Sequence, residues 1–216
     1  MQDSGMRDAD PSVLIIDDDP EFCDSVGRLL RSVGLRTEQF SSVHDFLNAK
    51  LADGPTCLVL DIRMPGRSGL ELQRELTAAN RQLPIIFITA HGDIPMTVQA
   101  MKGGAIEFLT KPFRDQDLLD AIETGLARDR ARRESEKTLV AVRERFETLS
   151  PREREIMIQA TAGRLNKQIA GDIGIAESTV KVHRTNLMRK MRTRSLPELS
   201  RIADMLKLTA EKPQRS

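Results

Sequence analysis

Aromatic residues are scarce in this chain. It has no tryptophan and no tyrosine, and it has seven phenylalanines among 216 residues. From residue 150 to the C-terminus there is no aromatic residue at all. Proteins that recognise single-stranded RNA stack its bases on aromatic rings. The absence therefore argues against that function for the C-terminal third.

Cysteine is also scarce, and long apolar runs are missing. The two cysteines, Cys23 and Cys57, stand in apolar surroundings without a CxxC spacing, so we expect buried, reduced thiols and neither a disulfide nor a metal site. No run approaches the roughly 18 apolar residues of a membrane span. The N-terminal segment MQDSGMRDAD is polar and acidic, unlike a secretory signal. We expect a cytoplasmic protein with no membrane partner.

Neither sign of charge dominates the whole chain, but the charges are unevenly distributed. Residues 1–125 hold 12 basic against 20 acidic side chains, a balance of −8. Residues 150–216 hold 14 against 7, a balance of +7. This asymmetry predicts two domains with different partners, the basic one being a candidate for nucleic acid. From charge alone, a basic face that is merely solvated is an equal alternative.

Strand-like and helix-like segments alternate through the first 125 residues. Amphipathic helical patterns cover residues 21–34 and 68–79, the second opening at Ser68. Alternation of this kind predicts an α/β fold with a doubly wound parallel sheet, whose ligands bind beyond the carboxyl ends of the strands. Strand-like runs occur at residues 13–17, 36–40, 57–61, 85–89 and 106–111.

The first strand-like run ends in three consecutive aspartates, in the stretch VLIIDDDP. Adjacent carboxylates repel one another, and crowding raises the pKa of at least one of them. A cation normally keeps such a cluster in its charged form. These residues alone also allow a simpler role, because an aspartate directly before Pro20 suits the start of a helix.

Other strand-like runs also end in polar side chains. Asp61, Thr89 and Lys111 each stand at the end of one such run, so a parallel sheet would bring them to the same edge as Asp17 and Asp18. Oxygen-rich acidic sites suit Mg²⁺. An aspartate beside that ion is a plausible phosphoryl acceptor, because the metal offsets the incoming charge.

Residues 126–149 lack glycine and proline and are rich in helix formers. Asp129 and Arg133 are spaced to pair on one helical face. Apolar residues recur at intervals of three and four, which fits either a solvated helical linker, the preferred interpretation, or a short dimer zipper. The apolar residues of this seam are Leu139, Val142, Phe146 and Leu149.

From Ser150 onward the pattern is purely helical. Ser150 precedes Pro151 and has Glu153 at the spacing of a capping box. Gly171 falls inside the second expected helix, where we expect it to permit close helix packing. A basic domain of four short helices fits a helix-turn-helix module. The four helices are expected within residues 150–163, 166–174, 177–191 and 195–208.

On these residues, the front half resembles the receiver domain of two-component response regulators. The stretch TAHGDIPMTVQAMKGGA is similar to the FixJ-type subgroup. The resemblance implies a flavodoxin-like receiver over residues 11–125 with Asp61 as the phosphoacceptor. It implies Mg²⁺, with Mn²⁺ able to take its place, bound by Asp18, Asp61 and the Arg63 carbonyl, and by Asp17 through water. The remaining implied roles are a switch pair, Thr89 and Phe108; a phosphate contact, Lys111, usually followed by a cis bond to proline; and a dimer face with Val98, Met101 and Lys102.

The rear half, from LSPRERE to NLMRKM, resembles the LuxR/FixJ-type helix-turn-helix, placed over residues 149–210 behind a helical linker at 126–148. The resemblance implies that residues 177–191 enter the DNA major groove. Three exposed side chains are suited to base edges, Lys181, Val182 and Thr185. Five others are suited to phosphate contacts, Asn166, Lys167, Thr179, Arg184 and Arg189.

The implied protein is a phosphorylation-dependent transcription factor without substrate turnover. Its implied partners are a sensor histidine kinase, double-stranded promoter DNA, a second copy of itself when phosphorylated and, for an activator, RNA polymerase. Two other classes compete with this interpretation. One is a phosphatase of the haloacid-dehalogenase type, whose nucleophile would lie among residues 17–19, and the other is a regulator that binds protein in place of DNA.

Overall fold

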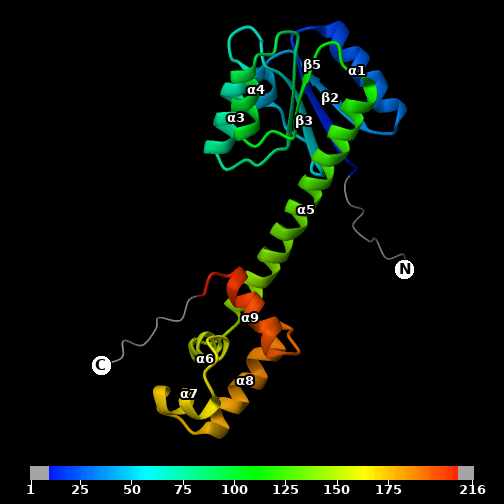
Figure 1. Cartoon of the computed structure of the whole chain (residues 1–216). Helices are drawn as coiled ribbons and strands as arrows, with labels where there is room; N and C mark the ends of the chain where they lie inside the picture. The colour runs from blue at the N-terminus through cyan, green and yellow to red at the C-terminus, as the bar shows by residue number, and fades with distance from the viewer. Residues whose placement is uncertain (1–9, 209–216) are drawn as a thin grey trace, which may run out of the picture. The chain divides into compact units, whose positions relative to one another are not determined.

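The computed structural model describes residues 10–208, and the chain divides into two units, residues 1–133 and 134–216 (Figure 1). Each unit is described by itself. The polar N-terminal segment, up to residue 9, and the domain limit expected at residue 210 lie outside the described residues. Within residues 10–208, no helix is long and apolar enough to cross a membrane.

A five-stranded parallel sheet forms the centre of the first unit. Its strands lie in the order β2-β1-β3-β4-β5, as in flavodoxin-like doubly wound sheets. The strands β1, β3 and β4 are buried along their whole length, because helices cover both faces of the sheet. The predicted fold class is thus confirmed. The strands are β1 (Ser12–Ile16), β2 (Arg36–Phe40), β3 (Thr56–Asp61), β4 (Ile85–Thr89) and β5 (Glu107–Thr110).

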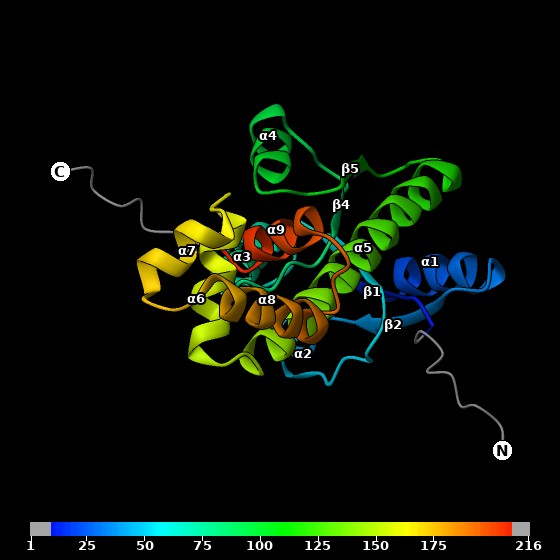
Figure 2. The same ribbon diagram turned by 90° about the horizontal axis from the view of Figure 1, so that it is seen from below.

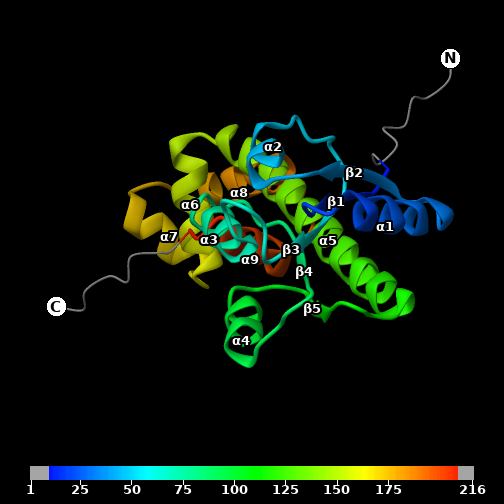
Figure 3. The same ribbon diagram turned by 90° about the horizontal axis from the view of Figure 1, so that it is seen from above.

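Five helices cover this sheet, two on one face and three on the other (Figure 3). The helix α1 (Pro20–Ser32) and the first part of α5 (Asp115–Glu147) share a core with one set of strand side chains. The helices α2 (Val43–Asn48), α3 (Gly69–Ala78) and α4 (Ile94–Lys102) pack on the opposite set. The strands therefore lie between two layers of helices.

Local signals in the sequence start two of these helices. Asp19 caps α1, where its side chain accepts hydrogen bonds from the N–H groups of the first turn. Ser68 and Glu71 form the capping box of α3. The capping role weighed for the triple aspartate therefore belongs to its third member, which leaves Asp17 and Asp18 free for another function.

Helix α5 runs without a break through the expected linker, so residues 126–148 have no helix start of their own. Gly125 lets α5 approach the sheet closely, since a Cβ atom there would lie 2.5 Å from the Cys57 sulfur. Cys57 and Cys23 are both buried and unpaired, as predicted. The predicted pair of Asp129 and Arg133 is also present, with 2.7 Å between Oδ2 and Nε.

Four helices follow α5 in the described part of the second unit, as predicted, and Figure 2 shows α7 joined to α8 by a short turn. Ser150 and Glu153 form the expected capping box at the first of them. A single apolar core holds them together. The helices are α6 (Pro151–Thr161), α7 (Asn166–Ile173), α8 (Glu177–Met191) and α9 (Leu196–Met205).

Two expectations for this unit are wrong. Val142 and Leu149 of the apolar seam are buried in the unit's own core, with Phe146 packed against it, so the seam is neither solvated nor a free zipper face. Gly171 is exposed, and a Cβ atom added there would meet nothing within 4 Å. It therefore does not serve close helix packing.

Candidate functional site

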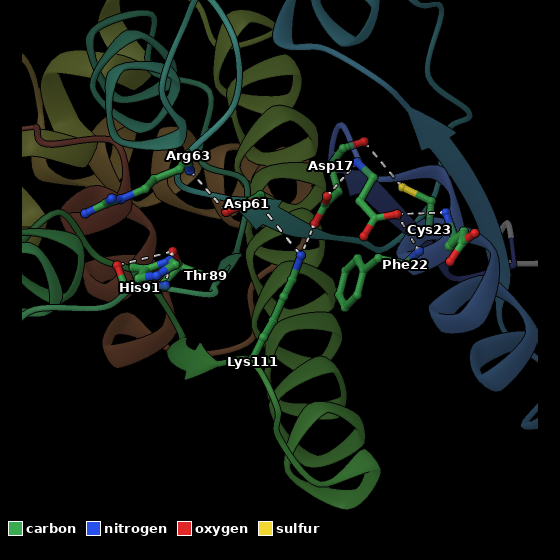
Figure 4. A network of polar contacts seen from close by, with 10 residues as sticks. Asp17, Phe22, Cys23, Asp61, Arg63, Thr89, His91 and Lys111 are labelled. Atoms are coloured by element: carbon green, nitrogen blue, oxygen red, sulfur yellow. Dashed lines mark hydrogen bonds and ion pairs between the residues drawn. The ribbon is translucent and has the colours of Figure 1, made fainter.

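Three carboxylates meet at the carboxyl edge of the sheet. Asp17 and Asp18 directly follow β1, and Asp61 is the last residue of β3. Each offers an oxygen, and these oxygens all lie within 4.8 Å of one another. Asp17 and Asp61 are buried, whereas Asp18 is exposed to solvent. Strands far apart in sequence thus build the acidic cluster that the sequence predicts, and Figure 4 shows its members Asp17 and Asp61 from close by.

Asp61 lies at the centre of this cluster. Burial raises the pKa of its carboxyl, and the nearby charge of Asp17 adds to the rise, while hydrogen bonding from the Arg63 N–H (3.1 Å) and the charge of Lys111 oppose it. The backbone of Gly69 lies against that of Asp61, since a Cβ atom on Gly69 would lie 2.4 Å from the Asp61 carbonyl oxygen. Glycine at the start of α3 therefore allows the close approach that shapes the site.

Lys111, which follows β5, supplies the positive charge of the cluster. Its Nζ lies 2.6 Å from Asp17 Oδ2 and 3.8 Å from Asp61 Oδ2. The Lys111–Pro112 peptide bond is cis, as the family resemblance implies. One ammonium against three carboxylates leaves an excess of negative charge, which favours a further cation.

The residues at this edge fit Mg²⁺. Their donors are hard carboxylate oxygens, which magnesium prefers, and the exposed Asp18 leaves room for the waters that the ion retains. The backbone of Arg63 lies beside the cluster, as its N–H bond to Asp61 requires. A site of this composition is suited to holding a divalent cation against a phosphoryl group.

Thr89 and Phe108 lie on neighbouring strands, β4 and β5, beside this edge. Thr89 is buried, and its hydroxyl oxygen accepts a hydrogen bond from the His91 N–H at 3.3 Å (Figure 4). Phe108 is half-buried and packs against the core beneath α4. A Cβ atom on Gly92 would approach its ring to 2.9 Å. The structure thus brings both members of the expected switch pair near the acidic edge, in one arrangement.

The expected dimer face lies on α4. Val98 and Met101 are 44% and 42% exposed, large fractions for apolar side chains, and Lys102 is exposed next to them. Ile94, one turn before Val98, is 80% exposed. Sequence reasoning did not single out Ile94, although its spacing of four from Val98 was visible. Ile94, Val98 and Met101 together form a small apolar strip on the surface of α4.

The side chains expected to contact DNA lie on α7 and α8 of the second unit. Lys181 is exposed and forms an ion pair with Glu177, with 3.1 Å between Nζ and Oε1. Arg184 donates a hydrogen bond to Asn166 Oδ1 at 2.6 Å, which ties the two helices together. The others expected to contact bases or phosphates are all exposed, namely Lys167, Thr179, Val182, Thr185 and Arg189.

Three charged residues with buried contacts were not anticipated from the sequence. Asp129 is fully buried, whereas the sequence predicts only its pairing with Arg133 on one helical face. Glu153 is 5% exposed, and Lys190 Nζ lies 2.6 Å from its carboxylate. Burial raises the pKa of Glu153, but the bonds from Lys190 and Ser150 outweigh it and leave the pKa lowered. No spacing rule connects residues 153 and 190, so only the fold reveals this pair.

Comparison with known proteins matches both units to families. A family model described as "Response regulator receiver domain" matches residues 13–123, and one described as "Bacterial regulatory proteins, luxR family" matches residues 147–203. Nodulation protein W of Bradyrhizobium diazoefficiens is 49% identical over 94% of this chain and 90% of its own length. The response regulator protein TmoT of Ectopseudomonas mendocina is 46% identical over 94% and 92%.

Solved structures give the same result. The response regulator StyR is 50% identical, with a TM-score of 0.80 over 91% of this chain and 99% of that one. Full-length FixJ from B. japonicum is 39% identical, with a TM-score of 0.55 over 92% and 98%. Both similarities cover both units, so these relatives have the same two domains in the same order along the chain.

Proposed function

The chain belongs to the two-component response regulators, as a receiver domain joined to a LuxR-type DNA-binding domain, and we propose that a phosphoryl group on Asp61 controls its binding to promoter DNA. The observation that carries this proposal is the convergence of Asp61, Asp17, Asp18 and Lys111 at one edge of the sheet. The phosphoryl group comes from a sensor histidine kinase. The protein acts in the cytoplasm as a stoichiometric acceptor, without turnover of an external substrate.

In the proposed reaction, an Asp61 carboxylate oxygen attacks the phosphorus of the donor. A bond forms between Asp61 Oδ and phosphorus, and the bond between phosphorus and the donor breaks, leaving its electron pair on the departing group. Lys111, 3.8 Å from Asp61 Oδ2, is close enough to contact the phosphoryl oxygens after a small movement. Thr89 can donate a hydrogen bond to the same group from the neighbouring strand.

Asp18, Asp61 and the Arg63 carbonyl would hold Mg²⁺ directly and Asp17 through water, and Mn²⁺ could take its place. Bound there, the ion would offset the negative charge that builds up between donor and acceptor. Asp19 has no part in this set, because its carboxylate caps α1. The chain's own contribution is to keep the one backbone donor and the three carboxylate donors together at one preorganised edge.

Phosphorylation is proposed to favour a homodimer. When Thr89 turns toward the phosphoryl group, it vacates space that Phe108 can enter, and the face of α4 that carries Val98, Met101 and Lys102 then pairs with a second copy. The phosphoryl group shifts this equilibrium only by stabilising the dimer-competent state more than the other. A dimer would bind two half-sites of an inverted repeat through α8, and an activator would also contact RNA polymerase.

Labelling with acetyl phosphate tests the acceptor. We expect one phosphoryl group per chain, located at Asp61 by tandem mass spectrometry, lost in Asp61→Asn and lost after EDTA treatment. Asp19→Asn is the matched control, since it removes a neighbouring aspartate outside the metal set and should still label. Label on any residue from 17 to 19, or undiminished label in Asp61→Asn, would exclude the assignment and favour the dehalogenase-type alternative.

A gel shift on a pool of random duplexes tests the second unit. Enrichment of an inverted repeat, strengthened by the acyl phosphate, is the expected result. A chain that retains no duplex at low salt would be a regulator that binds protein, the other alternative that the sequence left open.

A further inference from the structure

The Lys111 ammonium lies over an aromatic ring. Its Nζ is 3.7 Å from the centroid of the Phe22 ring, which lies beside it in Figure 4. The same nitrogen is 2.6 Å from Asp17 Oδ2 and 3.8 Å from Asp61 Oδ2. Two carboxylates and a ring face therefore surround one cation, and the ring is the only member of this set without charge.

Phe22 is held in place from two directions. It stands in the first turn of α1, and its N–H donates to Asp19 Oδ1 at 3.2 Å. On the other side, the ring of Phe113 meets it edge to face, with centroids 6.2 Å apart and planes at 83°. Phe113 belongs to the segment that follows Lys111. The backbone that carries the lysine thus also supplies the ring that fixes Phe22.

The contact restrains a side chain that is otherwise flexible. A lysine ammonium sits at the end of four methylene groups and takes many rotamers in solution. The negative face of an aromatic ring attracts a cation, more strongly where water is partly excluded. The Lys111 side chain is 21% exposed and that of Asp17 is 2% exposed. Water is therefore partly excluded where the ring meets the ammonium.

We propose that Phe22 is a positioning residue for phosphoryl transfer: its ring face holds the Lys111 ammonium between Asp17 and Asp61, ready for the incoming phosphoryl oxygens. The proposal rests on the function proposed for Asp61. With the ammonium held, the transfer from an acyl phosphate needs only a shift of Nζ away from Asp17 along the ring face. The acyl P–O bond breaks, the carboxylate leaves with the electron pair, and the Asp61 Oδ–P bond forms.

Substitutions at Phe22 test this role through the initial rate of Asp61 labelling by acetyl phosphate at saturating Mg²⁺. Phe22→Leu keeps apolar bulk but removes the π face, and we expect the rate to fall about two- to thirty-fold. Phe22→Tyr keeps the face and should restore the rate to within about two-fold of wild type. If Phe22→Leu labels as fast as wild type, or Phe22→Tyr is as slow as Phe22→Leu, the proposal is overturned.

Phe40→Leu is the matched packing control. Phe40 also belongs to an edge-to-face pair, with Phe46 at 5.7 Å and 78°, but the ring under the Lys111 ammonium is that of Phe22. We expect Phe40→Leu to lose stability as Phe22→Leu does while labelling at the wild-type rate. An equal loss of rate in both variants would mean that general loosening is responsible, and the positioning role would be rejected.

A spectroscopic measurement separates this proposal from the function on which it rests. Protons on the last methylene of Lys111 should show an upfield ring-current shift in the NMR spectrum of the metal-free protein. The shift should persist in Phe22→Tyr and vanish in Phe22→Leu. A shift that is absent from the wild type contradicts the positioning contact itself. A wild-type protein that shows the shift but takes no label at Asp61 contradicts the proposed function, and with it any role of Phe22 in the transfer.

Discussion

The carboxylate of Asp129, on helix α5, accepts a hydrogen bond from the backbone N–H of Thr56, the first residue of β3, with 2.9 Å between Oδ2 and N. Asp129 is fully buried and also binds the guanidinium groups of Arg132 and Arg133. Arg133 in turn reaches Asp53, 2.7 Å away. One buried carboxylate therefore fastens α5 to the amino end of the central strand.

Replacement of Asp129 should loosen this attachment. Removing one partner of a buried ion pair costs about 3–5 kcal/mol. The two arginines are 25% and 27% exposed, so for Asp129→Asn we expect a smaller loss, about 2 kcal/mol. The Thr56 amide should then exchange its hydrogen about 30-fold faster. Asp53→Asn is the control, because the Asp53 side chain is 97% exposed and its loss should change little. Equal exchange rates in the two variants would show that the attachment adds nothing.

Ionised Asp61 should destabilise the metal-free receiver. Burial raises the pKa of this carboxyl in the folded state above its value in the unfolded chain, so folding is favoured where the group is protonated and disfavoured as the pH rises through the folded pKa. We therefore expect Asp61→Asn to be more stable than wild type at pH 7. The difference should shrink as the pH falls through the raised folded pKa and level off below the ordinary aspartate pKa, about 3.9. Denaturant unfolding in EDTA, at pH 7 and at a pH below about 3.9, measures this difference in the free energy of unfolding. An Asp61→Asn protein less stable than wild type at pH 7 would contradict the burial argument.

Phosphorylation should raise the sedimenting mass to that of a dimer. Val98→Asp should block this increase, because it places a charge in the apolar strip of α4, where Val98 is 44% exposed. Val33→Asp is the control, since Val33 is exposed (52%) but lies at the end of α1. The face would be wrongly assigned if both variants dimerised equally well.

Lys181 and Lys167 should affect DNA binding in different ways. Lys181→Ala should chiefly change sequence preference, because losing a base contact costs about 1–3 kcal/mol at one position. Lys167→Ala should weaken all sequences alike and lower the salt slope by about one. Titrations on matched and scrambled sites at several salt concentrations distinguish the two effects. A Lys181→Ala protein that loses affinity equally for both sites would have lost only a phosphate contact.

Two glycines near the end of α7 should respond oppositely to alanine. Gly171 is a helical residue with open space around its Cβ position, so Gly171→Ala should stabilise the second unit by about 0.5–1 kcal/mol. Gly174 ends the helix with φ of 67°, a left-handed conformation, so Gly174→Ala should destabilise it. Thermal unfolding of the two variants checks both signs. A Gly171→Ala protein that unfolds at a lower temperature than wild type would mean that the site is strained or crowded.

Much of the fold and the acidic site could be predicted from the sequence. Five apolar runs separated by helical patterns define a parallel sheet, and the rule that ligands bind at the carboxyl ends of strands then groups Asp17, Asp61, Thr89 and Lys111 without knowledge of distances. The cap at Asp19 follows from local chemistry alone. These features depend on residues close together in the sequence or on a general property of parallel sheets.

The remaining features depend on packing partners that spacing does not reveal. The apolar residues Val142 and Leu149 predict a helix with one apolar face, but not that their own domain covers that face. Gly171 could equally have allowed close packing or stood in open space. Phe22 resembles any core residue in the first turn of a helix. Only the position of the Lys111 ammonium over its ring indicates a role at the acidic site. In each case the missing information is which distant residue lies opposite.

The close approach of Gly125 to Cys57 gives this protein a built-in reporter of its own movements. A thiol reagent needs the thiolate, and burial raises the pKa of Cys57 to about 12, so modification requires α5 to move away from β3 first. The rate of alkylation at Cys57 therefore measures how often α5 separates from the sheet. Comparing this rate with and without an acyl phosphate would time the response of α5 to an event at the other end of β3, with no probe added to the chain.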